Sequence, residues 1–302
     1  MTATAGLTPG QYQALVEARI FDPESLRRAL VDRRRRSVAG SDGRLVILAA
    51  DHTARGMLAV GPDALAVADR FSLLDRLVRA LGVPGVDGVL ASADLLEELA
   101  WLGALDDRLA IGTMNRGGVI GAAWELDARM TAYASDHIEE YGLDGGKTLL
   151  RIDDSDPAVA RTIEAVAATV TELSDRRLMC VIEPLPYVKD DVGRARLDPS
   201  VERLVKVVAV ASGLGSSSAY SWLKVPSTDR MAEVAGATSL PILMLGGDPG
   251  PDAPAVFGRW ESAMREPNVR GLVAGRALLY PHGEDVEDAV RRAARIVHGG
   301  VS

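Results

Sequence analysis

Lys224 is the residue whose surroundings most clearly suggest chemistry. It stands in the segment YSWLKVP, among apolar residues that predict a buried strand, and only four of the 34 basic residues of the chain are lysines. A buried ammonium costs free energy unless it is paired or loses its proton. As a neutral amine, Lys224 could attack a carbonyl carbon and form a Schiff base. The structural alternative is a side chain that snorkels to the rim of the sheet.

An amine nucleophile at this position needs a lowered pKa. At the ordinary lysine pKa of about 10.4, about one amine in 2,500 is neutral at pH 7. Burial and a second cation nearby both lower that pKa. Lys147, in KTLLRID, is the candidate cation, although its place at the start of a predicted strand also fits the opposite end of the sheet. If both lysines point inward, strand alternation turns Leu149, Arg151 and Trp222 inward as well.

Two carboxylates end apolar runs that predict strands. Glu183 is the last residue but one of LMCVIEP, and Asp51 is the last residue of LVILAAD. A carboxylate beside a Schiff-base lysine can carry protons during carbinolamine formation and carbon–carbon cleavage, which is the role expected for Glu183. Asp51 is expected to orient the lysine or a substrate hydroxyl, or else to act as a purely structural cap. Further substrate contacts are expected from two arginines, Arg55 and Arg151.

Glycines end the last two predicted strands. They are Gly246 and Gly247 in the first of these strands and Gly275 in the second, where Arg276 follows directly. Successive backbone N–H groups of a glycine-rich turn bind anions, and an arginine adds charge-assisted hydrogen bonds. We therefore expect a phosphate group here. The carboxylate of Asp248 would repel that phosphate, so its side chain is expected to turn away.

Other chemistries lack their characteristic residues. The four histidines are scattered without H-x-x-x-H or H-E-x-x-H spacing, so no metal site is predicted. A serine hydrolase is disfavoured because G-x-S-x-G is absent. The segment AADHTARG after the first predicted strand lacks the G-x-G-x-x-G spacing of a dinucleotide site. We therefore predict an enzyme without a cofactor.

Composition narrows the class of protein further. The 302 residues are 47% hydrophobic and 25% charged, which excludes a disordered, collagen-like or coiled-coil chain. A net charge of -8 and a pI near 5.2 argue against nucleic acid as a partner. MTATAGLTPG has no signal-peptide pattern, and no run of 18 apolar residues suggests a membrane span. With a single cysteine, Cys180, these features predict a cytoplasmic protein.

Eight β-rich segments must position the candidate residues. They alternate with stretches of helical periodicity, such as 156–173 and 200–212, which implies a parallel sheet covered by helices. Eight such units fit a closed (β/α)8 TIM barrel better than an open doubly wound sheet, and place the active site at the carboxyl ends of the strands. The predicted strands are 45–51, 86–92, 108–114, 147–153, 178–184, 220–226, 241–247 and 270–276.

Residues 1–44 are predicted to form an N-terminal helical extension that packs on the barrel of residues 45–302. Its two expected helices lie in GQYQALVEARI and DPESLRRALVDRRRR. The basic run from Arg33 to Arg36 could suggest a nucleic-acid patch, but four charges that close a helix also complement its dipole, which is the preferred interpretation. SGLGSSS at 212–218 is typical of a helix C-cap and linker.

These residues resemble the class I, Schiff-base aldolases of the DeoC/LacD type, over about residues 45–297. The resemblance rests on AADHTARG, GKTLLRID, VIEPLPY, WLKVP and GLVAGRALLY, and is closest to the tagatose-bisphosphate and sulfofructose-phosphate aldolase branch. It implies that Lys224 forms the Schiff base, that Glu183 and Lys147 are catalytic, and that Asp51 is the acid of the first strand. It also implies a phosphate contact at Gly275 and Arg276.

Two departures from that pattern concern the substrate. The fructose-bisphosphate branch usually carries an aromatic general acid after the fifth strand, where this chain has Glu183, Pro184 and Leu185. At the seventh strand, Leu245 stands before the glycines where the family tends to have Ser or Ala. A substrate other than fructose bisphosphate is therefore expected.

The leading hypothesis is a class I aldolase that cleaves a phosphorylated ketose, or a deoxy-keto sugar acid phosphate such as an inositol-pathway intermediate. The products would be dihydroxyacetone phosphate and an aldehyde. The alternatives are a noncatalytic phospho-sugar-binding barrel that acts as a sensor, and a Schiff-base lyase for an unphosphorylated keto acid. We expect a small phosphosugar as the partner, no nucleic acid and no membrane, and a homo-oligomer.

Overall fold

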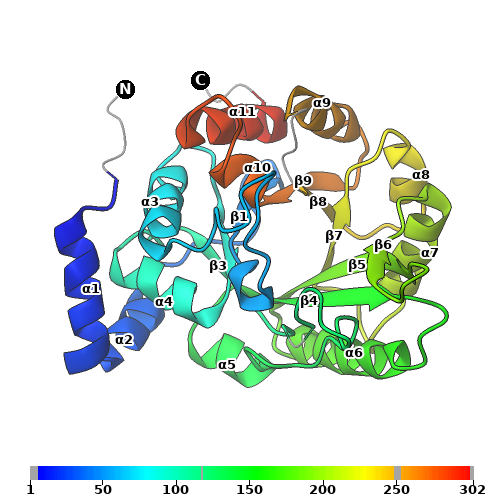
Figure 1. Ribbon diagram of the computed structural model, residues 1–302, viewed down its shortest axis with the longest axis horizontal. Helices are drawn as coiled ribbons and strands as arrows, with labels where there is room; N and C mark the ends of the chain where they lie inside the picture. Colours follow the sequence, from blue (N-terminus) through cyan, green and yellow to red (C-terminus); the bar gives the residue numbers. More distant parts are fainter. Residues whose placement is uncertain (1–5, 117, 248–252, 300–302) are drawn as a thin grey trace.

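All eight predicted strands form one closed parallel barrel, a TIM (β/α)8 barrel, in a computed structural model that describes residues 6–116, 118–247 and 253–299 (Figure 1). The strand order is β4-β3-β2-β1-β9-β8-β7-β5, and the pairing of β4 with β5 closes the ring. The predicted fold class is therefore confirmed. The barrel strands are β1 (Leu45–Ala49), β2 (Gly88–Ala91), β3 (Leu109–Thr113), β4 (Gly145–Ile152), β5 (Met179–Lys189), β7 (Ser221–Pro226), β8 (Ile242–Leu245) and β9 (Val269–Ala274).

Helices surround the barrel and bury its outer face (Figure 1). The predicted helices at 156–173 and 200–212 correspond to α6 and α7, and Gly213 is the C-cap of α7 as expected. In α6 the buried residues Val166, Val170 and Leu173 recur at spacings of four and three, which places them on one face. The helices after β1 are η1 (Thr53–Arg55), α3 (Arg70–Leu81), α4 (Ala93–Trp101), α5 (Ser135–Glu140), α6 (Val159–Asp175), α7 (Val201–Ser212), α8 (Met231–Gly236), α9 (Ala253–Ala263), α10 (Arg276–Leu279) and α11 (Val286–His298).

Alternation along the strands separates two apolar cores. Leu45 and Ile47 of β1 belong to a cluster inside the barrel, whereas Val46 and Leu48 belong to the cluster shared with the helices. Trp222 packs against the interior cluster, which sets the inward direction for alternate residues of β7. The same alternation therefore turns Lys224 inward.

Strand β5 is longer than predicted and continues beyond the barrel as a hairpin. It pairs antiparallel with β6 (Ala195–Leu197), and Tyr187 lies opposite Leu197. The carboxylate of Asp190 accepts backbone N–H bonds from Val192 at 3.2 Å and Arg194 at 2.8 Å, which fixes the turn. The hairpin thus holds the end of β5 in place beside the mouth of the barrel.

The two N-terminal helices, α1 (Pro9–Phe21) and α2 (Glu24–Asp32), lie outside the ring (Figure 1). The prediction that arginines close the second helix is wrong, because α2 ends at Asp32. Arg33 is buried and pairs with Asp144 at 2.8 Å, and Arg36 reaches Asp87 at 2.5 Å. These ion pairs fasten the extension to the residues that precede β4 and β2. The domain boundary near residue 44 stays a prediction.

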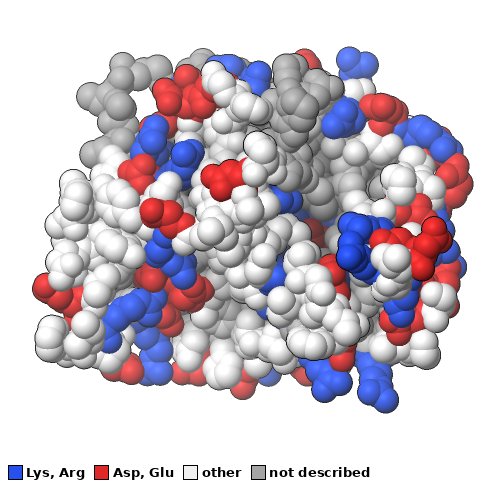
Figure 2. Space-filling view, in the orientation of Figure 1, with Lys and Arg blue, Asp and Glu red and all other residues white. Residues whose placement is uncertain are grey.

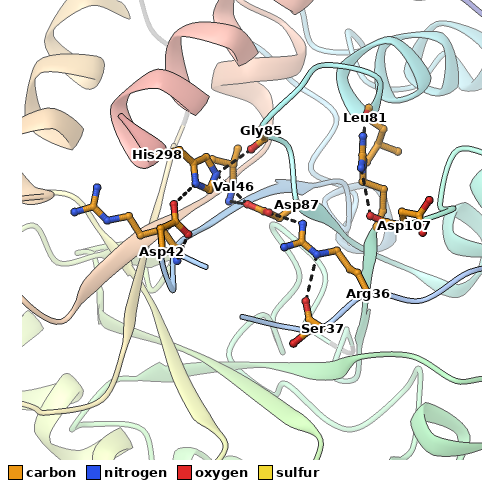
Figure 3. A network of polar contacts seen from close by, with 11 residues as sticks. Arg36, Ser37, Asp42, Val46, Leu81, Gly85, Asp87, Asp107 and His298 are labelled. Carbon is orange, nitrogen blue, oxygen red and sulfur yellow. Dashed lines mark hydrogen bonds and ion pairs between the residues drawn. The ribbon is translucent and has the colours of Figure 1, made fainter. Parts of the chain in front are cut away.

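The end of α11 is fastened to the amino-terminal ends of β1 and β2 by His298 (Figure 3). Its Nδ1 lies 2.6 Å from Oδ2 of Asp42, and its Nε2 lies 3.2 Å from Oδ2 of Asp87. The same Asp87 oxygen accepts the backbone N–H of Val46 at 2.7 Å. Hydrogen bonding to Asp87 raises the pKa of His298 to about 9, so the imidazole is protonated at neutral pH and donates from both nitrogens.

Candidate active site

A cavity of about 170 Å³ opens at the carboxyl ends of the barrel strands. Every site residue predicted from the sequence lines it except Lys147 and Arg151, which lie behind its wall. The charged lining residues are Asp51, Arg55, Arg116, Glu183, Lys224 and Arg276, and His52 lies among them. The cavity thus brings together residues of β5, β7, β8 and β9 and of the segments that follow β1, β3, β8 and β9.

Two lysines share one carboxylate in the barrel interior. Nζ of Lys224 lies 3.0 Å from Oε1 of Glu183, and Nζ of Lys147 contacts Oε2 of the same carboxylate. The exposed fractions are 3% for Lys224 and 0% for Lys147. Lys147 is the third residue of β4 and not its first, because the strand begins at Gly145. Its side chain therefore reaches the carboxylate that also contacts Lys224.

Asp51 follows β1 and contacts two cations. Its Oδ2 lies 3.4 Å from Nζ of Lys147 and also contacts the guanidinium of Arg116. Arg116 follows β3, where its Nε donates to Oγ1 of Thr113 at 3.0 Å. Asp51 is therefore placed to orient Lys147, the lysine behind the cavity wall.

Burial and mutual charge shift the pKa values of these groups. Burial lowers the pKa of Lys224, and burial together with the charge of Arg116 lowers that of Lys147 well below its ordinary value. Burial alone would raise the pKa of Glu183, but Lys147 and Lys224 hold it well below its usual range. An ionised carboxylate between two lysines of reduced basicity is able to accept and return protons.

Arg55 and Arg151 both use their guanidinium groups to hold the loop after β3. Nη2 of Arg55 lies 3.8 Å from a carboxylate oxygen of Glu125, and Nη1 of Arg151 lies 3.5 Å from the same oxygen. Nε of Arg55 also donates to the carbonyl of Gly118 at 3.0 Å. Arg55 still lines the cavity, whereas the side chain of Arg151 is fully buried. Of the two predicted substrate contacts, only Arg55 therefore faces the cavity.

Three glycines form the wall of the cavity at the ends of β8 and β9. Gly247 has φ +65°, the left-handed region that favours glycine. A Cβ on Gly275 would lie 2.3 Å from the carbonyl oxygen of Ala49 and 2.5 Å from Cε1 of His52, so only glycine fits there. Arg276 follows, and its Nη1 donates to the carbonyl of Ala59 at 3.1 Å. Asp248 lies outside the described residues.

Sequence reasoning missed two residues that line the cavity, Arg116 and Tyr187, and gave no role to His52, which follows Asp51 and also lines it. Arg116 is 8% exposed, and its segment TMNRGG shows no motif. Tyr187 lines the cavity because the alternation of Glu183 and Leu185 continues along β5, a signal that was available in VIEPLPY. Burial and the charges of Lys224 and Arg276 lower the pKa of His52 to about 3, so its imidazole is neutral.

The described residues contain no cluster of three or more His, Cys, Asp or Glu side chains suited to a metal ion. In the same part of the chain, no helix combines the length and the apolar character needed to cross a membrane. Positive and negative side chains are interspersed around the face shown in Figure 2, without a broad basic area. Cys180 is buried, and burial raises the pKa of its thiol to about 12.

The chain is similar to one family and to several solved structures. The sequence profile described as Cgl0159-like matches residues 43–294. The crystal structure of Cgl0159 from Corynebacterium glutamicum (Brevibacterium flavum) shares 44% sequence identity, covers 97% of this chain and 98% of that chain, and superimposes with a TM-score of 0.93. A search of curated proteins found no significant match.

More distant structures share the fold. An archaeal fructose 1,6-bisphosphate aldolase is 20% identical, covers 91% of this chain and 100% of its own, and has a TM-score of 0.64. A fructose-bisphosphate aldolase from Slackia heliotrinireducens is 14% identical, covers 99% of this chain and 90% of its own, and has a TM-score of 0.63. At these identities the similarity concerns the barrel.

Proposed function

We propose that this chain, which belongs to the Cgl0159-like family, is a class I aldolase that cleaves a carbon–carbon bond through a Schiff base on Lys224. The observation that carries the proposal is the arrangement of Lys224. It is a buried amine that lines a cavity and shares the carboxylate of Glu183 with a second buried lysine. Schiff-base chemistry needs such an amine, with a lowered pKa and a proton carrier beside it.

The residues of the site divide the reaction between them. Nζ of Lys224 attacks the carbonyl carbon of the substrate, and the carbinolamine loses water to give an iminium. Glu183, 3.0 Å from Nζ, carries the protons of these steps. It then takes the proton of the hydroxyl group on the carbon that becomes the aldehyde, as the carbon–carbon bond to that carbon breaks. The electrons of that bond enter the iminium, which leaves an enamine and a free aldehyde. Protonation and hydrolysis of the enamine release the second product and restore the amine.

Lys147, behind the cavity wall, and Asp51, which lines the cavity, support these steps. The positive charge of Lys147 makes the protonated form of Lys224 less favourable. The contact of Asp51 with Lys147 keeps that lysine in place at 3.4 Å. This pair of lysines with one glutamate is the feature that supports a relationship to the tagatose-bisphosphate and sulfofructose-phosphate aldolase branch.

The substrate that we propose is a phosphorylated ketose or a deoxy-keto sugar acid phosphate, cleaved to dihydroxyacetone phosphate and an aldehyde. Gly246, Gly247 and Gly275 would offer backbone N–H groups to the phosphate, and Arg276 would add a guanidinium. Support comes from their positions on one wall of the cavity. The archaeal aldolase with a catalytic lysine covalently bound to a carbinolamine intermediate has the same barrel fold.

The proposal extends to the setting of the protein. We place it in the cytoplasm as a homo-oligomer that acts on a small phosphosugar, without nucleic acid or cofactor. The mixed charges of Figure 2 and the acidic pI support the absence of nucleic acid as a partner.

Reductive trapping tests the proposal. Borohydride added with dihydroxyacetone phosphate should attach a stable mass to the peptide that contains Lys224, and Lys224→Met should abolish it. Lys206→Met is the matched control, because the Lys206 side chain is 54% exposed on α7. Adduct on another lysine would move the nucleophile. No adduct at any pH would favour the noncatalytic sensor, and trapping with an unphosphorylated keto acid alone would favour the other lyase.

A further inference from the structure

A chain of five buried charges of alternating sign runs through the site. Arg116 contacts Asp51, Asp51 lies 3.4 Å from Lys147, Lys147 contacts Glu183, and Glu183 lies 3.0 Å from Lys224. Each of the five residues is at most 8% exposed. Each carboxylate therefore lies between two cations, and a cation stands at each end of the chain.

The number of charges in this chain decides how many protons the lysines hold. With both carboxylates ionised, Arg116, Lys147 and Lys224 would together leave one positive charge in excess. Burial of net charge is costly, and the arginine keeps its proton, so the favoured state has one proton fewer on the lysines. Because Glu183 contacts both lysines, the remaining proton can pass between them.

We propose that Arg116 is a positioning residue that sets the number of protons shared by Lys147 and Lys224, and so keeps one of them a free amine. Without Arg116, the two carboxylates and two protonated lysines of this chain of charges would balance, which favours a proton on both amines. Substrate meets the free amine at Lys224, since that lysine lines the cavity and Lys147 is fully buried. This inference rests on the proposed Schiff-base function.

The other charged and titratable groups around Lys224 lie outside this chain of five charges, and among them the charge of Arg55 also lowers the pKa of Lys224. Arg55 and Arg151 share the carboxylate of Glu125, and Arg276 donates to the carbonyl of Ala59. His52 is neutral, because burial and the charges of Lys224 and Arg276 lower its pKa to about 3. Tyr187 completes the lining, with its ring 5.6 Å from the guanidinium carbon of Arg151.

The contacts of Arg116 fix its guanidinium at Asp51. Its Nε donates to Thr113, and its backbone N–H donates to Oγ1 of Thr131 at 2.9 Å. The preceding residue, Asn115, ties the loop to β4, since it donates to the carbonyl of Leu149 at 2.7 Å and accepts the N–H of Leu149 at 2.6 Å. The contacts of Arg116 and of Asn115 therefore hold the charge of Arg116 at one end of the chain of five charges.

The test measures the protonation of Lys224 without substrate. Formaldehyde and cyanoborohydride methylate a lysine only while its amine is neutral, and mass spectrometry reads each lysine separately across pH. The exposed Lys189 and Lys206 of the same sample are internal references. Arg116→Met should raise the pH midpoint at Lys224 by about one unit or more, which is about tenfold less methylation below the midpoint. Arg116→Lys should restore the wild-type midpoint.

A second variant separates charge from structure. Asp51→Asn should lower the midpoint, and the double variant Asp51→Asn with Arg116→Met should return it near the wild-type value, because one charge of each sign is lost. An unchanged midpoint in Arg116→Met, or in Asp51→Asn if the first variant fails to fold, overturns the inference. Failure of the aldolase proposal appears separately, as wild-type protein that forms no adduct with dihydroxyacetone phosphate.

Discussion

Nζ of Lys224 lies 3.0 Å from Oε1 of Glu183 inside the barrel, so the amine and the carboxylate that we propose as its proton carrier are within hydrogen-bond distance. General acid–base catalysis requires this proximity, because the carboxylate must reach the proton that it transfers. The second oxygen of Glu183 contacts Lys147, which gives the carboxylate a further partner when Lys224 is bonded to substrate.

Replacement of the carboxylate should separate trapping from turnover. In Glu183→Gln, Lys224 loses the anion beside it, so its pKa falls further and the iminium still forms. Cleavage should decrease by about 10²-fold to 10⁴-fold, because the amide cannot carry protons. Borohydride trapping and steady-state turnover measure the two effects. Loss of trapping together with turnover would show that Glu183 is needed to hold the lysine in place.

Replacement of the buried cation should shift the pH dependence instead. In Lys147→Met, a positive charge disappears behind Lys224, so the pKa of Lys224 rises, and the pH midpoint for trapping should increase by about one unit or more. The exposed Lys189→Met is the control. Unchanged trapping and turnover at every pH would mean that Lys147 has only a structural role.

Much of the fold and of the site could be predicted because both depend on local pattern. Apolar strands mark the barrel, and a charged residue inside such a strand, as with Lys224 and Glu183, must point to a polar cavity or to a partner. The position of Lys147 was ambiguous because the strand begins two residues earlier, at Gly145 and Gly146, which carry no apolar side chain.

The features that the sequence did not predict depend on contacts between segments far apart in the chain. Arg116 lies in a loop without a motif, and only the closed barrel brings it to Asp51. The run of arginines after α2 is typical of the end of a helix. In the structure, however, Arg36 pairs with Asp87 and Arg33 with Asp144, more than 50 residues away in the chain. Sequence spacing does not reveal such pairs.

The proposed phosphate site predicts a substrate-dependent effect. Arg276→Ala should lower kcat/KM for a phosphorylated substrate far more than for its unphosphorylated analogue, because the lost charge-assisted interaction is worth about 1.5 to 3 kcal/mol. The ratio of kcat/KM for the two substrates measures it, with Arg129→Ala, at a side chain that is 71% exposed, as the control. Equal loss on both substrates would mean that Arg276 acts through its hydrogen bond to Ala59, and an unphosphorylated keto acid would become the better candidate.

The ion pairs of His298 with Asp42 and Asp87 predict how the free energy of unfolding depends on pH. Its pKa is raised to about 9 in the folded protein, mainly by the hydrogen bond to Asp87, and is about 6.5 in the unfolded chain. A raised pKa means that the folded state binds the proton more tightly, so this stabilisation is complete below pH 6.5 and is lost as the pH rises through about 9. The stabilisation from this raised pKa is at most about 3 kcal/mol, because the His298 side chain is 12% exposed and solvent screens part of the interaction. Urea unfolding of wild type and His298→Gln between pH 6 and pH 10 should give stabilities that converge at the alkaline end. His137→Gln, at a side chain that is 47% exposed, is the control. A constant difference in stability between wild type and His298→Gln across this pH range would show that packing of the imidazole, and not its charge, holds α11.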